Sequence, residues 1–102
     1  MSTLAAASIK KIVVACDAGM GSSVMLAGTL RRQLKSHGVA VDHAPVSEIP
    51  ADADLILTNV GLADRVRASA PGKPVVAFQI FLGDPAVETV VKAIKEGGAI
   101  DV

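Results

Sequence analysis

The residues best suited to chemistry lie together in one short segment, from Cys16 to Ser23. Cys16 is the only cysteine of the 102-residue chain, and two glycines and two serines follow it at Gly19, Gly21, Ser22 and Ser23. Glycines allow successive backbone N–H groups to point inward as an anion-binding nest, and serine hydroxyls add donors. Donors around a thiol stabilise its thiolate and can hold a tetrahedral oxyanion bonded to the sulfur. The segment therefore predicts transfer of a phosphoryl group onto and off Cys16.

Other interpretations of this segment fit its residues less well. A lone cysteine at a strand end can be a small buried hydrophobic residue, but a merely structural turn does not need so many donors. A Walker A loop needs a Gly-Lys-Ser/Thr end, which the chain lacks, and a dinucleotide fingerprint needs a third glycine where Val24 stands. Cysteine phosphatases carry an arginine six residues after the cysteine, where this chain has Ser22. Without that guanidinium, the charge that develops during hydrolysis is poorly stabilised.

The elements that must position the segment follow from the apolar pattern. Short, continuous apolar runs are typical of strands buried on both faces of a parallel sheet. We expect strands at about 12–15, 39–44, 55–58 and 74–78. Apolar residues at helical spacing predict three helices. We expect these helices to run from a capping Ser22 or Ser23 to His37 before Gly38, over 62–69, and from Pro85, capped by Asp84, to the Gly97-Gly98 pair.

Strands that alternate with helices predict a single α/β domain over residues 1–102. Its core would be a four-stranded, parallel, doubly wound (Rossmann-like) sheet flanked by about three helices, with right-handed crossovers. Residues 1–8 and 99–102 are expected to be tails. In such sheets the ligand sits at the carboxyl ends of the strands, where the strand order reverses. The segment from Cys16 to Ser23 joins the first strand to the first helix, so we expect it at that position.

Composition excludes several classes of function. Ten basic residues balance ten acidic ones, and two phenylalanines are the only aromatic residues, so the chain lacks the features of a nucleic-acid binder. One cysteine cannot form an internal disulfide or a multi-thiolate metal site, and we expect no metal. His37 and His43 are expected to be ordinary surface residues. No apolar run approaches the roughly 20 residues of a membrane span, and the start does not resemble a signal peptide. These features suit the cytoplasm.

The segment from Ile12 to Ser23 closely resembles the active-site loop of the mannitol-type enzyme IIB of the bacterial sugar phosphotransferase system. The likeness continues through Leu30 and Arg31 and, more weakly, through 54–58 and on past Phe81-Leu82 to the last helix. It implies that Cys16 is the phosphorylated nucleophile. The residues implied to bind the phosphate are Asp17, Ala18, Gly19, Met20, Gly21, Ser22 and Ser23.

The resemblance also implies partners. A histidine of enzyme IIA would donate the phosphoryl group, and a sugar or sugar alcohol, mannitol first, would accept it at the membrane enzyme IIC during uptake. No cofactor is implied, and the chain is expected to be a cytoplasmic monomer that meets the inner face of the membrane only through IIC. The chain differs from mannitol relatives at Val24 to Ala27 and at Thr58 to Leu62. These differences concern the identity of the sugar and not the transfer of the phosphoryl group. A different class of function is a regulatory module whose phosphocysteine signals sugar availability.

Several residues outside the segment from Cys16 to Ser23 are predicted to lie on the surface or around the site. Arg31 and Arg32 are expected to form a solvated helix face. Thr58 and Asn59 end the third predicted strand, so we expect them at the rim of the site. The apolar residues 80–82 follow the fourth strand, and they would pack over the edge of the core or form an apolar surface beside the cysteine on which a partner docks.

Overall fold

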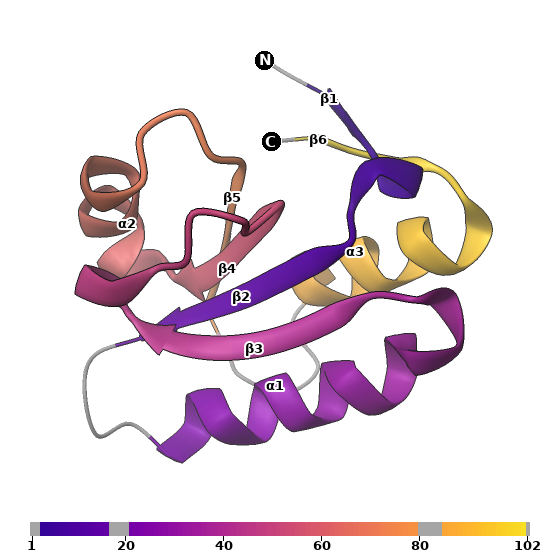
Figure 1. Cartoon of the computed structure of the whole chain (residues 1–102), viewed down its shortest axis with the longest axis horizontal. Helices are drawn as coiled ribbons and strands as arrows, with labels where there is room; N and C mark the ends of the chain where they lie inside the picture. Colours follow the sequence, from indigo (N-terminus) through magenta and orange to yellow (C-terminus); the bar gives the residue numbers. More distant parts are fainter. Residues whose placement is uncertain (1–2, 17–20, 80–84, 102) are drawn as a thin grey trace.

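A computed structural model describes residues 3–16, 21–79 and 85–101 of the chain. Within these ranges, strands and helices alternate along most of the sequence (Figure 1). The strands are β1 (Thr3–Ala5), β2 (Lys11–Cys16), β3 (Ala40–Pro45), β4 (Leu55–Asn59), β5 (Val75–Phe78) and β6 (Ala99–Asp101). The α-helices are α1 (Gly21–Leu34), α2 (Ala63–Ser69) and α3 (Pro85–Glu96).

The central sheet has four strands in the order β3-β2-β4-β5, and every neighbouring pair is parallel. This confirms the predicted doubly wound sheet. Strand β2 is central, with β3 on one side and β4 on the other. The chain leaves β2 towards β3 through α1 and leaves β4 towards β5 through α2, so the strand order reverses between β2 and β4.

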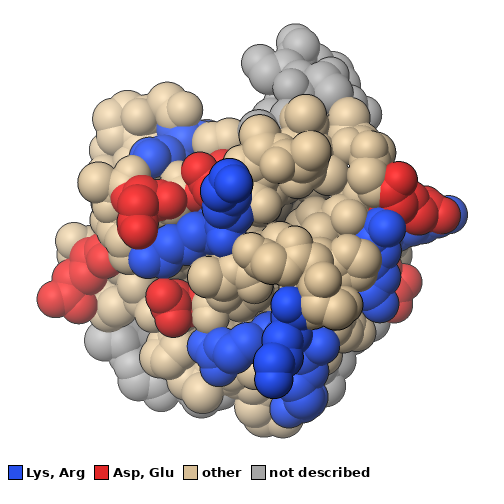
Figure 2. Space-filling view, turned by 45° about the vertical axis from the view of Figure 1, so that its right-hand side comes forward, with Lys and Arg blue, Asp and Glu red and all other residues tan. Residues whose placement is uncertain are grey.

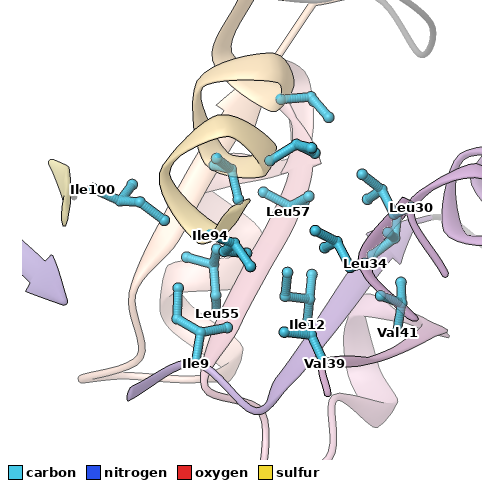
Figure 3. Packing of buried hydrophobic residues seen from close by; sticks show 14 of the residues in the cluster. Ile9, Ile12, Leu30, Leu34, Val39, Val41, Leu55, Leu57, Ile94 and Ile100 are labelled. Atoms are coloured by element: carbon cyan, nitrogen blue, oxygen red, sulfur yellow. The ribbon is translucent and has the colours of Figure 1, made fainter. Parts of the chain in front are cut away.

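Helices cover both faces of the sheet. Helices α1 and α3 share a large apolar cluster with one face, whereas α2 packs with a second cluster on the other face (Figure 1). Side chains alternate along β2, so Ile12 and Val14 enter the first cluster and Val13 and Ala15 enter the second. This two-sided burial explains why the apolar run in β2 is continuous. Figure 3 shows the first cluster, in which leucines of α1 and β4 pack together.

Glycines end the first and third helices, as the sequence predicts. Gly38 follows α1 and a 3-10 turn (Lys35–His37), and its φ is 72°. After α3, Gly97 has a φ of 71°, and the N–H of Gly98 donates to the carbonyl oxygen of Ala93 at 2.8 Å. This bond is the mark of a Schellman end, in which the left-handed residue is usually glycine because it has no Cβ.

The expectation that 1–8 and 99–102 are tails was wrong for 3–8 and 99–101, the parts of these segments that the structure describes. Strand β1 pairs with β6 in an antiparallel ribbon, with Leu4 opposite Ile100. Ala6 and Ile100 are buried, and both join the cluster between the sheet and α3. The ribbon could not be predicted from the sequence, because each strand has only three residues and the two strands are far apart in the sequence. Pairing across such a separation leaves no local pattern.

Candidate functional site

Cys16 is the last residue of β2, and its side chain is only 7% exposed. Helix α1 begins at Gly21, so the chain passes from the cysteine to a helix N-terminus within a few residues. Both lie at the carboxyl end of the sheet, beside the reversal between β2 and β4 (Figure 1). The prediction that Cys16 lies at the switch point, where a strand of the parallel sheet leads into the first helix, is confirmed, but this strand is the second in the chain and not the first, because β1 precedes it.

The sulfur of Cys16 lies against the edge strand of the sheet. Its Sγ is 3.7 Å from the carbonyl oxygen of Ala44, to which the thiol donates. Pairing between β2 and β3 continues as far as Cys16 opposite Pro45, whereas pairing between β2 and β4 ends one residue earlier, at Ala15 opposite Thr58. The strands β2 and β4 therefore part immediately before the cysteine, which is the usual position of a ligand crevice.

The predicted phosphate-binding residues divide into two groups. Gly21, Ser22 and Ser23 form the first turn of α1. The expectation that Ser22 or Ser23 caps the helix was wrong, because the helix already begins at Gly21. The backbone N–H groups of a first helical turn have no partner within the helix and lie at its positive end. Asp17, Ala18, Gly19 and Met20 lie outside the described residues, as do the capping Asp84 and the apolar residues 80–82.

Thr58 and Asn59 occupy different positions at the end of β4. Thr58 is completely buried, and its hydroxyl donates to the carbonyl oxygen of Ala15 at 3.1 Å, so it lies beneath the site and not at its rim. Asn59 is half-buried, and its side-chain oxygen accepts from the N–H of Gly61 at 2.9 Å. Asn59 thus caps a 3-10 turn (Val60–Leu62) that follows β4 at the carboxyl end of the sheet.

Arg31 makes a contact that its sequence position did not suggest. Its Nε and Nη2 both donate to the carbonyl oxygen of Val41, at 3.1 and 2.7 Å. Arg31 therefore ties α1 to the edge strand β3, while its side chain stays 54% exposed on the solvated helix face that the sequence predicts. Arg32 is exposed, and its Nη2 reaches Thr29 Oγ1 at 3.5 Å. Sequence periodicity could not separate these two arginines, because both lie on the outer part of the same helix.

Charged groups gather at the opposite end of β2. Lys11 Nζ lies 3.1 Å from a carboxylate oxygen of Asp52 and 3.7 Å from one of Asp42. The hydrogen bond to Asp52 raises the pKa of Lys11 above its ordinary value of 10.5, although partial burial opposes this. Figure 2 shows basic and acidic side chains side by side on much of one face. In the described part of the chain, no group of three or more His, Cys, Asp or Glu residues could hold a metal ion.

Three exposed apolar side chains lie on the described elements that begin at the carboxyl end of the sheet. Among the described residues, the large hydrophobic side chains that are exposed are Val24, Met25 and Val60, at 49%, 62% and 50%. Val24 and Met25 lie near the N-terminus of α1, and Val60 directly follows β4. All three therefore border the carboxyl end of the sheet. No helix in the described ranges combines the length and apolar character of a membrane span.

Fold and site together define a parallel α/β domain that carries a single cysteine at its switch point. A family model described as "PTS system, Lactose/Cellobiose specific IIB subunit" matches residues 11–93. The chain belongs to this family of IIB subunits of the phosphotransferase system. The matched range contains β2, which ends at Cys16, and most of the elements that follow it.

Curated relatives extend the likeness. The "PTS system mannitol-specific cryptic EIICB component" of Escherichia coli K12 is 40% identical over 83 residues, which cover 79% of this chain and 18% of that protein. The mannitol-specific EIICB component of Bacillus subtilis is 35% identical over 97 residues, covering 93% of this chain and 20% of that protein. The mannitol-specific EIICBA component of Buchnera aphidicola is 38% identical over 91 residues, covering 86% of this chain and 14% of that protein. The chain thus spans a fifth or less of these relatives.

Proposed function

We propose that the chain is a phosphocysteine carrier of the sugar phosphotransferase system, in which Cys16 accepts and then donates a phosphoryl group. The observation that carries this proposal is the position of Cys16, the chain's one cysteine, at the carboxyl end of β2. There the sulfur lies at the switch point of the sheet, with the start of α1 a few residues further along the chain. Membership of the IIB family supports the same role.

The proposed cycle has two substitutions at phosphorus. In the first, the Cys16 thiolate attacks the phosphorus of a phosphohistidine on enzyme IIA. The S–P bond forms, the N–P bond breaks, and the histidine nitrogen leaves with the electron pair. In the second, a sugar hydroxyl attacks the same phosphorus, the O–P bond forms, and the S–P bond breaks. The thiolate leaves with its electron pair, and the hydroxyl proton passes to a base or to solvent.

The segment from Asp17 to Ser23 is proposed to hold the transferred group. Phosphoryl oxygens carry negative charge throughout both substitutions, so donors that already point at them lower the barrier. The first turn of α1 forms the end of this segment, and it supplies N–H groups that have no partner within the helix together with the positive end of the helix dipole. Ser22 takes the position where a cysteine phosphatase has its arginine, which favours a carrier whose phosphoryl group resists hydrolysis.

Both partners are proposed to dock at the carboxyl end of the sheet. Val24, Met25 and Val60 are the exposed large apolar residues on the described elements that begin at that end, and we call these three residues the docking patch. IIA must deliver the phosphoryl group, and the sugar-loaded IIC must collect it, at the same sulfur. The two partners therefore use this end in turn, and brief contacts of this kind bury small interfaces. The chain is proposed to act as a monomer on the cytoplasmic face of the membrane.

Mannitol is the sugar alcohol that we propose as acceptor. The curated relatives named above are mannitol-specific by their names, whereas the family model is named for lactose and cellobiose. Comparing IIC-containing membranes specific for mannitol, cellobiose or lactose tests the sugar. Transfer from the phosphorylated chain to mannitol alone is the expected result, and faster transfer to either disaccharide would reject mannitol.

The carrier function is tested by intact-protein mass spectrometry. The chain is incubated with phosphoenolpyruvate, the general phosphotransferase proteins and a IIA of demonstrated activity. We expect one added phosphoryl group, which is absent from Cys16→Ser. A His37→Ala/His43→Ala double variant is the matched control, because it removes the two histidines, the residue type that carries the group on IIA, and it should still be phosphorylated. An adduct that survives in Cys16→Ser, or no adduct at all, would overturn the proposal.

A further inference from the structure

Thr58 is buried in a way that its side chain does not favour. It is 0% exposed, and among the described residues it is the one buried side chain that is polar or charged. Burying a hydroxyl costs free energy unless it is hydrogen-bonded, and valine has nearly the same shape without that cost. The run Leu55-Ile56-Leu57 before it is wholly apolar. The hydrogen-bond partner of this hydroxyl should therefore explain why threonine, and not valine, occupies the position.

The partner is the carbonyl oxygen of Ala15, 3.1 Å from Thr58 Oγ1. This carbonyl belongs to the peptide that joins Ala15 to Cys16. A carbonyl oxygen has two lone pairs, so the hydroxyl can add a bond to one already used in the parallel pairing of β2 and β4. The hydrogen bond thus restrains the orientation of the peptide immediately before the cysteine.

The position of this bond along the sheet matters as well. Ala15 opposite Thr58 is the last pair between β2 and β4, while β2 stays paired with β3 for one more residue. Beyond Ala15, therefore, β2 is no longer held from the β4 side. Ala15 belongs to the apolar cluster on the α2 face, and side chains alternate along the strand, so Cys16 faces the opposite way. Thr58 lies opposite Ala15 and so on the α2 face, and its hydroxyl therefore acts on the thiol through the backbone of β2.

We propose that Thr58 is a positioning residue for the nucleophile. Its hydroxyl fixes the peptide before Cys16 at the point where β2 and β4 part, and this sets the direction in which Sγ leaves the strand. The proposal rests on the carrier function of Cys16 proposed above. Loss of the hydroxyl should free the end of β2, which makes the buried thiol more accessible to reagents but aligns it less well for attack on phosphorus.

The test compares Thr58→Val, which removes the hydroxyl and keeps the shape, with Thr58→Ser, which keeps the hydroxyl. Two rate constants are measured: alkylation of Cys16 by iodoacetamide at fixed pH, and single-turnover phosphoryl transfer from phosphorylated IIA. In Thr58→Val we expect severalfold faster alkylation and roughly tenfold slower transfer, with the half-saturating IIA concentration unchanged. Thr58→Ser should restore both rates. If Thr58→Val does not fold, Thr58→Ala takes its place.

A matched control is Ile56→Val, which shortens a buried side chain two residues earlier on the same face of β4. It should lower the melting temperature and leave both rate constants as in the wild type. The proposal is overturned if Thr58→Val keeps both wild-type rates, or if Thr58→Ser behaves like Thr58→Val. A wild-type chain that is never phosphorylated, but whose alkylation responds to these variants as expected, would reject the carrier function and retain the positioning role.

Discussion

The thiol of Cys16 donates to the carbonyl oxygen of Ala44, with Sγ 3.7 Å from that oxygen. Only a protonated thiol can make this bond, because neither a thiolate nor a phosphorylated sulfur carries a proton. A negatively charged sulfur or phosphoryl group would instead face the negative end of the carbonyl dipole. Phosphorylation of Cys16 must therefore remove this hydrogen bond from the carbonyl oxygen of Ala44.

This relationship predicts a change in the carbonyl environment of Ala44. In protein labelled with carbon-13, we expect the carbonyl signal of Ala44 to shift on phosphorylation of Cys16, because the oxygen loses a hydrogen bond. Cys16→Ala should move the signal in the same direction. The carbonyl of Ala53, which lies before β4 at the other end of the sheet, serves as the reference and should not move. An unchanged Ala44 signal in the phosphorylated protein would contradict the expectation.

Much of the fold and the position of the candidate site could be predicted because the signals are local. The apolar run that ends at Cys16 identifies a strand buried on both faces, and Gly38 and Gly97 mark helix ends through their positive φ. Alternating strands and helices admit few topologies, so the switch point follows from the order of elements. The position in the fold of Cys16, the nucleophile of the proposed site, could thus be predicted from the sequence alone.

The contacts around the cysteine could not be predicted in the same way. The hydrogen bond from Thr58 to Ala15 joins residues 43 positions apart, and that from Cys16 to Ala44 joins residues 28 apart. Both depend on strand register, for which a two-sided apolar strand gives no clue, because either face tolerates the same residues. The partner of Arg31 is a backbone carbonyl, which the sequence does not distinguish at all.

The terminal ribbon should contribute to stability through Ile100. This side chain is buried in the main cluster, although it belongs to one of the last residues of the chain (Figure 3). Ile100→Ala should lower the free energy of unfolding by about 2–5 kcal/mol, through lost burial and the cavity that remains. Denaturant unfolding measures this. Ala99→Ser, at an exposed position of the same strand, should change it by about 0.5 kcal/mol or less. Equal stability of the two variants would mean that 99–102 is a tail after all.

The pair of Lys11 and Asp52 should give stability a dependence on alkaline pH. The pKa of Lys11 is raised in the folded protein, chiefly by the hydrogen bond to Asp52, so the charged amine favours folding. That contribution is fully present below the unfolded-state pKa and is lost as the pH rises through the higher folded-state pKa. Asp52→Asn should therefore melt slightly below the wild type at neutral pH, and the difference should disappear once the pH passes well above 10.5.

The control for this pH dependence is Asp64→Asn, which removes a carboxylate 3.6 Å from Arg67. Arginine stays protonated throughout this range, so any difference caused by Asp64→Asn should persist at high pH. Melting curves of the three proteins between neutral and strongly alkaline pH decide the matter. If Asp52→Asn and Asp64→Asn respond alike, titration of Lys11 is not the cause.

The docking patch should matter for partner binding and not for folding. Met25→Ser and Val60→Ser each replace an exposed apolar side chain, so the melting temperature should stay nearly unchanged. If IIA covers these side chains, each change should weaken binding by roughly five- to tenfold, about 1 kcal/mol, as is usual for an apolar contact inside an interface. Titration of each variant with IIA measures the dissociation constant.

Ala68→Ser is the matched control, because Ala68 is exposed on α2 and lies outside the docking patch. It should bind IIA like the wild type. Since the sugar-loaded IIC must reach the same sulfur, Met25→Ser and Val60→Ser should also slow transfer to IIC-containing membranes, and the control should not. Normal affinity for IIA together with slow transfer to IIC would assign the patch to the acceptor alone. Wild-type behaviour in both assays would show that the partners approach Cys16 over another surface.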